Sequence, residues 1–418
     1  MGLLRWLLSL FGGASRPSER PPRRRVTPRR RPAPSLVPLQ ADRIARPARA
    51  ASVLEKTPPY PFARREPRTG RFVDLAGDMD RDRLQSRGLP IVSAPEHLIE
   101  LFDLTLPKIA WLTSRFVPGG RPESVKQAHY VFHWKAKRRG GHRLIESPKP
   151  LLRDVQTRIL REILDRVPPH PAAHGFTRGR SILSNAQPHC DRAVVVKWDL
   201  ENFYASVRFN RVVAIFRSLG YSREAAIWFA SLTTSAIPAD LPFPDSGAHA
   251  TDPYLGRHLP QGAPTSPALA NLSAYSLDVR LCGLAKSFGG VYTRYADDIT
   301  ISGDDAFATS LRTLIPLVQQ VIRRERFRVH PKKRKTMRRS HRQTVAGVVV
   351  NTKPNIARDE YDRLKAILHN AKRTGFQSQN REGHSDFAAH LRGRIAHVAM
   401  LNPQRGAKLL AIFESIDG

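Results

Sequence analysis

The hydrophobic pattern of the chain divides it at about residue 90. Residues 14–50 are rich in Arg, Pro and Ala without apolar periodicity, and a linker-like composition continues to about residue 90. So few large apolar side chains cannot offset the conformational entropy of the segment by burial. We therefore expect residues 1–90 to be a basic, largely disordered extension that binds nucleic acid nonspecifically or is only a solvated tail. From residue 91 onward, apolar residues recur at helix and strand spacings, which predicts a globular part.

Helical and strand patterns alternate irregularly in this globular part. The i, i+3, i+4 apolar spacing of residues 151–164 predicts a helix, and the β-branched run of residues 192–200 predicts a strand. Alternation without the regular order of a Rossmann fold predicts an α+β fold. Further helices are predicted over 94–104, 210–219, 265–281 and 306–324 with two or so over 357–415, and further strands in hairpins over 130–147 and 291–303 and in a last strand over 344–351.

Capping residues mark the ends of two of these helices. Asn210 is a candidate N-cap for the helix over 210–219, and Gly220 is its candidate stop. Ser266 is a candidate cap for the next helix. Pro267 follows at the first helical position, where its missing N–H costs nothing.

The net charge of the chain points to a polyanionic partner. Its 418 residues include 69 Lys and Arg against 36 Asp and Glu, which gives a formal charge of +33 at pH 7. Such a charge bears on partners and solubility rather than on fold, and nucleic acid is the usual polyanion. An acidic membrane surface is the alternative. Residues 323–342 are too basic for an ordinary solvated face, which favours contact with a nucleic-acid backbone.

Other features of the sequence favour a cytoplasmic protein. No apolar stretch reaches the roughly 18 residues that cross a bilayer. The opening MGLLRWLLSLFGG is either an interfacial anchor or a partner-docking segment, and its Arg cluster follows the apolar run instead of preceding it as in a signal peptide. Cys190 and Cys282 lie far apart without CxxC spacing, which indicates a reducing compartment and argues against a zinc site or a disulfide framework.

Three aspartates are the candidate catalytic residues. Asp199 closes an apolar strand, and Asp297 and Asp298 follow about one hundred residues later between strand-like segments. A carboxylate beside hydrophobic strands is costly to bury unless a cation or a partner compensates it. One or two Mg²⁺ ions, with Mn²⁺ as a substitute, would offset the repulsion, and two ions about 4 Å apart can clamp the oxygens of an in-line phosphoryl displacement. Taken alone, Ala-Asp-Asp is more often a structural turn.

The surroundings of these aspartates resemble those in reverse transcriptases. YADD at 295–298 resembles the catalytic signature of that family, and VVKWDLENFYASV at 195–207 resembles its first catalytic motif. LPQGAPTSPALANL at 259–272 is similar to the form in bacterial retron-type reverse transcriptases. NAQPH at 185–189 and VAGVVVN at 345–351 resemble two further retron motifs, and all five occur in the family's order.

The resemblance implies a right-hand polymerase architecture. Residues 91–192 would form the fingers, 193–351 the palm and 352–418 a helical thumb, with fingers and palm interleaved. Two features depart from the family. Ala346 replaces the Thr of its VTG motif, so that hydroxyl is absent, and the Pro/Gly-rich loop over 236–260 looks like an insertion without an indicated role.

The resemblance also assigns roles at the catalytic centre. Asp199, Asp297 and Asp298 would be the catalytic and metal-binding aspartates, with the backbone carbonyl of Leu200 as an auxiliary ligand. Tyr204 would be a steric gate, because its ring would clash with the 2′-hydroxyl of a ribonucleotide. The alternative for Tyr204 is an ordinary core aromatic.

Further residues are implied to bind nucleotide and RNA. Gln261 and Gly262 would line the nucleotide and template pocket, where Gly262 lets the backbone approach the substrate closely; simple helix packing is the alternative for this region. Three basic residues of the fingers hairpin would clamp the triphosphate, namely Lys135, Lys137 and Arg143. The candidate RNA-contacting residues are Asn185, His189, Lys332, Lys333, Arg334 and Lys335. Hydrogen bonding within the protein is the alternative for Asn185 and His189.

The implied activity is RNA-directed DNA polymerisation. Retron enzymes copy part of a cognate structured non-coding RNA into multicopy single-stranded DNA (msDNA) from dNTPs, starting at an internal guanosine 2′-hydroxyl and leaving a 2′,5′-branched RNA–DNA product. Many such systems act in phage defence, for which an effector or toxin protein is a possible partner. The residues after Asn351 suffice for a thumb but leave no room for an RNase H domain, which disfavours a retroviral enzyme. Two alternatives stay open: a defence-associated reverse transcriptase outside true retrons, and a nucleic-acid-binding module on a degenerate polymerase scaffold.

Overall fold

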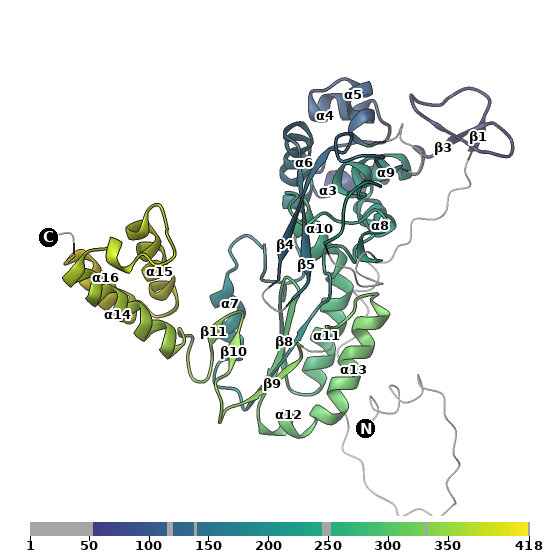
Figure 1. Cartoon of the computed structure of the whole chain (residues 1–418). Helices are drawn as coiled ribbons and strands as arrows, with labels where there is room; N and C mark the ends of the chain where they lie inside the picture. Colours follow the sequence, from purple (N-terminus) through teal and green to yellow (C-terminus); the bar gives the residue numbers. More distant parts are fainter. Residues whose placement is uncertain (1–52, 115–119, 138–139, 245–251, 331–332, 417–418) are drawn as a thin grey trace, which may run out of the picture. The chain divides into compact units, whose positions relative to one another are not determined.

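A computed structural model describes residues 53–114, 120–137, 140–244, 252–330 and 333–416. Helices and antiparallel strand pairs are mixed along these residues, so the predicted α+β class is confirmed (Figure 1). The helices are α3 (Arg81–Ser86), α4 (His97–Phe102), α5 (Leu106–Leu112), α6 (Pro150–Glu162), α7 (Ile182–Ala186), α8 (Phe209–Leu219), α9 (Arg223–Thr233), α10 (Ser266–Ser273), α11 (Tyr275–Ser287), α12 (Asp305–Thr309), α13 (Leu311–Arg324), α14 (Arg358–Thr374), α15 (Phe387–Leu401) and α16 (Pro403–Glu414). The strands are β1 (Val53–Glu55), β2 (Arg64–Arg65), β3 (Phe72–Asp74), β4 (Tyr130–Ala136), β5 (His142–Pro148), β6 (Val194–Asp199), β7 (Val291–Tyr295), β8 (Asp298–Gly303), β9 (Lys335–Arg338), β10 (Thr344–Val345) and β11 (Val348–Val349).

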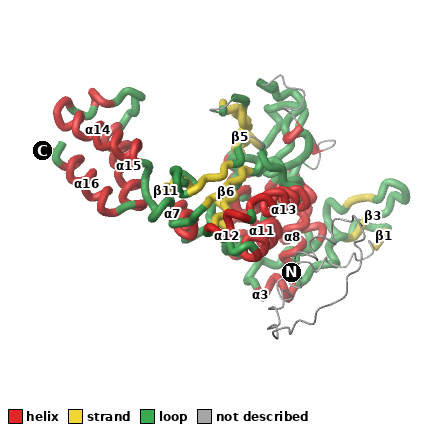
Figure 2. The backbone as a smooth tube through the Cα atoms, turned by 90° about the horizontal axis from the view of Figure 1, so that it is seen from below, coloured by secondary structure: helices red, strands yellow, loops and turns green. Residues whose placement is uncertain are grey.

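The central sheet has the strand order β7-β8-β6-β9. Figure 2 shows its strand β6 in yellow among the red helices α7, α11, α12 and α13. The β-branched strand β6 is buried on both faces, because alternate residues point to opposite sides of a sheet. Val194 and Trp198 join the main core, whereas Val195 joins a second core that includes the C-terminal helices. Because β6 and β8 are neighbours, the sheet carries the two predicted aspartate segments side by side.

Three predicted elements are each divided into two. The helix predicted over 265–281 consists of α10 and α11, and the helix predicted over 306–324 consists of α12 and α13. The last strand predicted over 344–351 is a hairpin of β10 and β11, whose two-residue turn has φ 46° at Ala346 and 87° at Gly347. Apolar periodicity continues across a break of one or two residues, so it does not reveal such breaks.

Of the three predicted helix ends, one agrees with the structure and two are shifted. Gly220 ends α8 with φ 116°, as predicted. Asn210 lies inside α8, and Arg208 occupies the N-cap position without a side-chain cap bond. Ser266 is already helical, and Thr265 is the N-cap of α10. The Phe209 N–H donates to the Arg257 carbonyl at 3.0 Å and the Ser266 N–H donates to the Ala263 carbonyl at 3.3 Å. Backbone acceptors therefore bind the first N–H of each helix without a side-chain cap.

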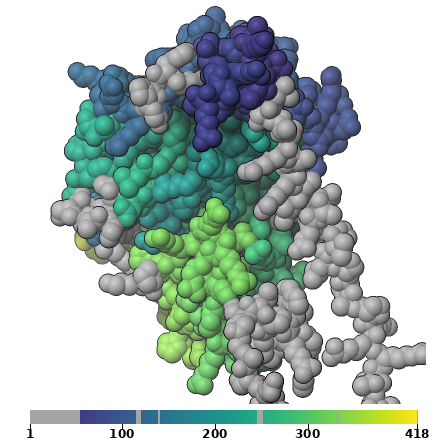
Figure 3. Space-filling model, turned by 90° about the vertical axis from the view of Figure 1, so that its right-hand side faces the viewer, coloured from purple at the N-terminus to yellow at the C-terminus, as the bar shows by residue number. Residues whose placement is uncertain are grey.

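The prediction of disorder is wrong for residues 53–90, which pack against α8 and α9. β1, β3 and β2 form a sheet there, and Leu84 is fully buried in the main core. Arg217 of α8 also forms an ion pair with Asp78, with 2.8 Å between Nη2 and Oδ2. Figure 3 shows this segment in purple, resting on the blue and teal parts of the chain. A few residues of this segment contact partners far away in the sequence, which the average composition does not reveal. Residues 1–52, for which the composition also predicts disorder, lie outside the described residues.

The β4–β5 hairpin packs against the Pro/Gly-rich loop that precedes α10. Leu144 of β5 forms a small core with Ile237 and other loop residues. The Trp134 indole N–H of β4 donates to the Pro242 carbonyl at 3.0 Å. The described part of the loop, which excludes residues 245–251, therefore supports this hairpin.

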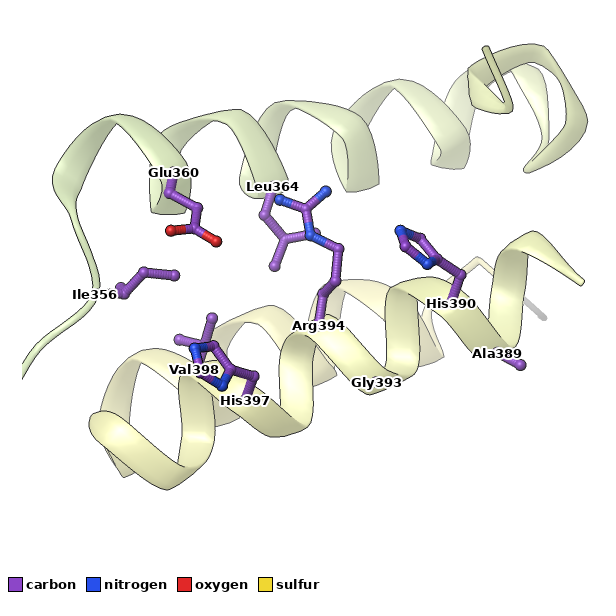
Figure 4. A pocket seen from close by; sticks show the side chains of 9 residues that line it. All are labelled: Ile356, Glu360, Leu364, Ala389, His390, Gly393, Arg394, His397 and Val398. Carbon is purple, nitrogen blue, oxygen red and sulfur yellow. The ribbon is translucent and has the colours of Figure 1, made fainter. Parts of the chain in front are cut away.

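Three helices, α14 to α16, follow β11 and share the second hydrophobic core. A cavity of about 360 Å³ lies between α14 and α15 (Figure 4). Its lining residues are Ile356, Glu360, Leu364, Ala389, His390, Gly393, Arg394, His397 and Val398. None of the predicted site residues lines it. Across the described part of the chain, no helix combines the length and the apolar character that a membrane span requires.

Candidate active site

β6 and the β7–β8 hairpin bring three aspartates to one end of the central sheet. Asp199, the last residue of β6, lies opposite Asp298, the first residue of β8, in the antiparallel register. Asp297 lies in the two-residue turn of the hairpin, which the register pair of Tyr295 and Asp298 closes. The Leu200 N–H donates to the Asp297 carbonyl at 2.8 Å and joins the two segments. The structure thus unites the aspartates that the motifs nominate and places Leu200 beside them.

The turn between β7 and β8 has an unusual backbone that close packing holds. Ala296 has φ 53°, in the left-handed region that a Cβ atom disfavours. Gly175 lies so close to this turn that a Cβ built on it would be 2.5 Å from the Ala296 nitrogen. The His174 N–H donates to the Arg294 carbonyl at 2.8 Å, just before the turn. The segment around Gly175 therefore supports the turn that carries Asp297.

Burial and like charge raise the pKa of two of the aspartates. The pKa of Asp297 is raised by burial and then by the negative charges of Asp199 and Asp298. Burial also raises the pKa of Asp298, and the Lys197 ammonium opposes that shift. These raised pKa values mean that the carboxylates have too little compensating positive charge around them.

Two lysines supply part of the missing charge. The Lys197 Nζ lies 2.5 Å from Asp298 Oδ2, and the Lys333 Nζ lies 2.8 Å from Asp199 Oδ1. Lys197 precedes Asp199 by two residues on β6, so the two side chains leave the strand on the same face. Each lysine therefore occupies an oxygen that a metal ion could otherwise bind.

The donor set fits a hard divalent cation. Carboxylate oxygens are the ligands that Mg²⁺ prefers, and the raised pKa values of Asp297 and Asp298 mark negative charge that a cation would stabilise. Within the described residues, no three His, Cys, Asp or Glu side chains already form a metal-binding group. The lysine contacts explain why no such group is preformed, because Lys197 and Lys333 each bind one of the carboxylates. A metal would have to replace those contacts.

Tyr204 lies near the aspartates and is half-buried. Burial and the negative charge of Asp297 raise the pKa of Tyr204 to about 12, whereas the positive charge of Arg143 opposes the shift. Its ring centroid lies 5.7 Å from that of the buried Phe203, which in turn packs on Phe327 at 5.8 Å. The position is compatible with the predicted steric gate, which stays a prediction.

The three basic residues predicted to clamp the triphosphate share one face of the β4–β5 hairpin. Lys135 and Arg143 form a cross-strand pair, and Lys137 follows Lys135 by two positions. All three are exposed. Since the charge of Arg143 acts on Tyr204, this face is within electrostatic reach of the predicted steric gate.

Gln261 and Gly262 connect the start of α10 to β5. The Glu146 N–H donates to the Gln261 carbonyl at 2.9 Å. Gly262 has φ 137°, and a Cβ on it would be 2.9 Å from the Glu146 carbonyl oxygen. The Glu146 side chain is itself buried, and its Oε2 lies 2.9 Å from His258 Nε2. The close approach that requires glycine here is therefore to the protein's own backbone, and the predicted approach to substrate stays a prediction.

Asn185 and His189 are buried, which argues against direct contact of their side chains with RNA. The His189 ring contacts both strands of the β7–β8 hairpin, with Nδ1 2.6 Å from Ser302 Oγ and Nε2 2.8 Å from Thr293 Oγ1. Burial lowers the pKa of His189 to about 3, so its ring is neutral near pH 7. The sequence spacing of the two residues did not reveal burial. For His189 the alternative, hydrogen bonding within the protein, is the one that the structure supports.

The basic run after α13 divides into residues with different surroundings. Lys333 is half-buried and pairs with Asp199, whereas Arg334 and Lys335 are exposed. Lys332 lies outside the described residues. RNA contact by the exposed pair stays a prediction.

Sequence reasoning did not single out three residues beside the aspartates. Lys197 and Arg294 each place a charge inside an apolar strand, and that pattern was the available signal. Phe176 is 60% exposed, has φ 58°, and its ring centroid lies 6.5 Å from that of Tyr295. No sequence signal distinguishes Phe176 from an ordinary loop aromatic.

Comparison with known proteins agrees with this geometry. Residues 135–357, more than half of the chain, match the family model described as reverse transcriptase (RNA-dependent DNA polymerase). The Retron Mx65 reverse transcriptase of Myxococcus xanthus is 39% identical over 332 residues, which cover 79% of this chain and 73% of that protein.

Two further relatives carry the same description. The Retron Mx162 reverse transcriptase of Myxococcus xanthus is 37% identical over 345 residues, covering 79% of this chain and 68% of the relative. The Retron Ec86 reverse transcriptase of Escherichia coli is 30% identical over 279 residues, covering 66% and 77% respectively. The chain therefore belongs to the reverse transcriptase family, and within it to the bacterial retron reverse transcriptases, which are RNA-directed DNA polymerases.

Proposed function

We propose that this polymerase copies part of a cognate structured non-coding RNA into 2′,5′-branched msDNA by two-metal phosphoryl transfer. RNA templating and dNTP use follow from the family, whereas the branched product and the two Mg²⁺ ions belong to the proposal. The observation that carries the metal assignment is the meeting of Asp199, Asp297 and Asp298 on neighbouring strands, with the pKa values of Asp297 and Asp298 raised.

The aspartates would hold the ions, with the Leu200 carbonyl as an auxiliary ligand. When bound, the ions neutralise charge that develops on the transferring phosphoryl group and its leaving oxygen. Lys197 and Lys333 compensate the carboxylates in the ligand-free protein, since each donates to one aspartate oxygen. The lysines would thereby orient two of the carboxylates before substrate arrives.

The neighbouring residues would select and hold the nucleotide. The Tyr204 ring lies near Asp297, where it would collide with a ribose 2′-hydroxyl and favour dNTPs. Lys135, Lys137 and Arg143 share one exposed hairpin face that suits a triphosphate. Gln261 and Gly262, at the start of α10, would border the same pocket.

Residues 91–192, 193–351 and 352–418 would act as fingers, palm and thumb. The catalytic sheet falls in the proposed palm, and α14 to α16 form the proposed thumb. Exposed Arg334 and Lys335 would contact the RNA backbone. The retron names of the relatives support a retron enzyme. As such an enzyme, the protein would use a cognate RNA and act in phage defence in the cytoplasm, with an effector protein as a further partner.

The metal assignment is tested by Asp297→Asn and Asp298→Asn. Each change removes a charged ligand, so we expect Mg²⁺-dependent dNTP incorporation on an RNA template to fall at least about 1000-fold. Asp359→Asn is the matched control, because Asp359 lies at the exposed start of α14, where it pairs with Arg342 at 2.8 Å. The control should stay within about twofold of wild type. Wild-type rates in either active-site variant would refute the assignment.

The product assignment is tested by sequencing nucleic acid that copurifies with the protein expressed from its native locus. RNA-linked DNA with a 2′,5′ branch is the expected result. Unbranched DNA would replace the retron proposal with a defence-associated reverse transcriptase outside true retrons. RNA binding without synthesis on any template would instead indicate a binding module on a polymerase scaffold.

A further inference from the structure

A buried polar cluster lies next to the turn that carries Asp297. Its members are Arg294, Asp278 and Asn271, whose exposed fractions are 0%, 0% and 2%. They come from β7, α11 and α10, so three elements of the main core meet at this point. The proposed function gives no role to any of them.

Arg294 forms a bidentate ion pair with Asp278. The Arg294 Nε donates to Asp278 Oδ1 and its Nη2 donates to Oδ2, both at 2.7 Å. The Tyr292 hydroxyl donates to the same Oδ1 at 2.6 Å. Because the planar guanidinium is bound along one edge, it keeps a single orientation.

The other edge of the guanidinium reaches the catalytic turn. The Arg294 Nη1 donates to the Ala296 carbonyl at 2.9 Å and to Asn271 Oδ1 at 3.0 Å. The Ala296 carbonyl belongs to the peptide group that joins Ala296 to Asp297. The hydrogen bond therefore constrains the orientation of the peptide from which the Asp297 side chain starts.

Asn271 links the same cluster to the other side of the turn. Its Nδ2 donates to the Gly175 carbonyl at 2.9 Å. Gly175 is the residue whose added Cβ would lie 2.5 Å from the Ala296 nitrogen. Arg294 and Asn271 thus hold the turn and its packing partner in one connected network.

Stability alone does not account for this cluster. Burying an ion pair has a desolvation cost that the attraction of its charges offsets only in part, and an apolar core of equal volume is often as stable. A fully hydrogen-bonded polar network does fix one arrangement, because its donors and acceptors are directional. The arrangement fixed here is that of the Ala296–Asp297 peptide.

We propose that Arg294 is a positioning residue for polymerisation, held in place by Asp278 and Asn271. Through the Ala296 carbonyl it sets the direction of the Asp297 carboxylate, and this role rests on the proposed metal-binding function of Asp297. Arg294 acts through the backbone of the turn, since its hydrogen bonds go to Asp278, to Asn271 and to the Ala296 carbonyl.

The test compares Arg294→Met with the matched control Arg217→Met in the full-length protein. Arg217 also forms a largely buried ion pair, with Asp78 at 2.8 Å, but Asp78 belongs to the segment before α3 and not to the active site. The measurements are kcat, the KM for dNTP, the Mg²⁺ concentration for half-maximal rate, and the thermal unfolding midpoint.

Arg294→Met should lower kcat at least about 30-fold and raise the Mg²⁺ requirement at least about threefold, with the dNTP KM within about twofold. Arg294→Lys should recover part of kcat, because one donor can still reach the Ala296 carbonyl. Arg217→Met should lower the unfolding midpoint and leave kcat and the Mg²⁺ requirement within about twofold.

Asn271→Ala serves as a second variant if Arg294→Met does not fold. It keeps the Arg294–Asp278 pair, so the same changes in kcat and Mg²⁺ requirement are expected at about a fivefold loss of kcat. A folded Arg294→Met or Asn271→Ala protein with wild-type kcat and Mg²⁺ requirement would overturn the inference, as would a loss that only follows the folded fraction. Continued Mg²⁺-dependent synthesis by Asp297→Asn would instead overturn the proposed function, so the two failures are distinguishable.

Discussion

The β7–β8 and β10–β11 hairpins both turn in two residues, and both place an alanine first in the turn. Ala296 has φ 53° and Ala346 has φ 46°. The second turn residues differ: Asp297 in one hairpin and Gly347, with φ 87°, in the other. A Cβ on Gly347 would meet nothing within 4 Å, whereas Gly175 presses directly on the backbone of the β7–β8 turn.

The conformation of the β10–β11 turn depends mainly on the turn residues themselves, whereas that of the β7–β8 turn depends on contacts from other parts of the fold. At β10–β11 both turn residues are left-handed, and Gly347 suits the second of these positions. In the β7–β8 turn Ala296 has a left-handed φ but Asp297 does not, and contacts from Gly175 and Arg294 hold the Ala296 backbone from outside. Residues at functional sites often adopt locally unfavourable backbone conformations, which contacts from the rest of the fold stabilise.

The largest contrast is expected between Gly175→Ala and Gly347→Ala. The new Cβ at residue 175 would displace the Ala296 backbone, and a ligand displaced by about 1 Å can cost about 100-fold in rate. We expect Gly175→Ala to lower kcat about 100-fold. Gly347→Ala should cost about 1–2 kcal/mol of unfolding free energy through its left-handed φ but leave kcat within about twofold. Steady-state dNTP incorporation and urea denaturation measure both; equal kcat losses in the two variants would contradict the contrast.

His189→Ala should lower the free energy of unfolding by about 2–3 kcal/mol, because it leaves the buried Ser302 and Thr293 hydroxyls without their ring partner. RNA affinity should stay within about twofold, since the side chain is buried. A filter-binding assay and urea denaturation at pH 7.5 separate the two effects. A large loss of affinity in folded protein would restore the RNA-contact interpretation.

The same variant tests the pH dependence of stability. Burial lowers the pKa of His189 from 6.5 to about 3, so the folded state binds fewer protons than the unfolded state between these values. The contribution of His189 to stability is therefore complete above about pH 6.5 and decreases as the pH falls toward 3. The difference in unfolding free energy between wild type and His189→Ala should shrink from pH 7.5 to pH 5; an increase would contradict the sign.

Asp297→Asn should stabilise the metal-free protein by about 1 kcal/mol at pH 7 while abolishing synthesis. The pKa of Asp297 is raised, so its ionised form is disfavoured in the folded state, and a neutral amide removes the repulsion from Asp199. Denaturation in EDTA measures this gain, and added Mg²⁺ should narrow it by stabilising wild type. Asp359→Asn, as the exposed control, should change stability by less than about 0.5 kcal/mol.

The smallest effect is expected for Ala346→Gly. Relief of the left-handed alanine is worth about 1–2 kcal/mol, and the extra chain entropy of glycine cancels about 0.5–1 kcal/mol of it. We therefore expect a net gain of no more than about 1.5 kcal/mol without a change in kcat. A loss of stability would show that the β10–β11 turn also depends on contacts from outside.

Sequence reasoning nominated the three aspartates that the structure brings together, because motif order and strand patterns are local properties. The β-branched run before Asp199 and the apolar segments around Asp297 and Asp298 predicted strands, and the strands are present. It did not show that Asn185 and His189 are buried, because residue type and spacing do not reveal whether a polar side chain is buried. It failed for residues 53–90, which are stabilised in part by distant partners on α8 and α9.

The sequence by itself determined the family, the α+β class and the three aspartates, because these depend on residue types at fixed spacings. Only the tertiary structure decided which cations compensate those aspartates and which groups hold their turn. Lys333 meets Asp199 across more than one hundred residues, and Arg294 meets Asp278 between a strand and a helix. These pairs matter because a buried charge is costly without a partner, and here the partners are brought together by the fold and are distant or on different elements in the sequence.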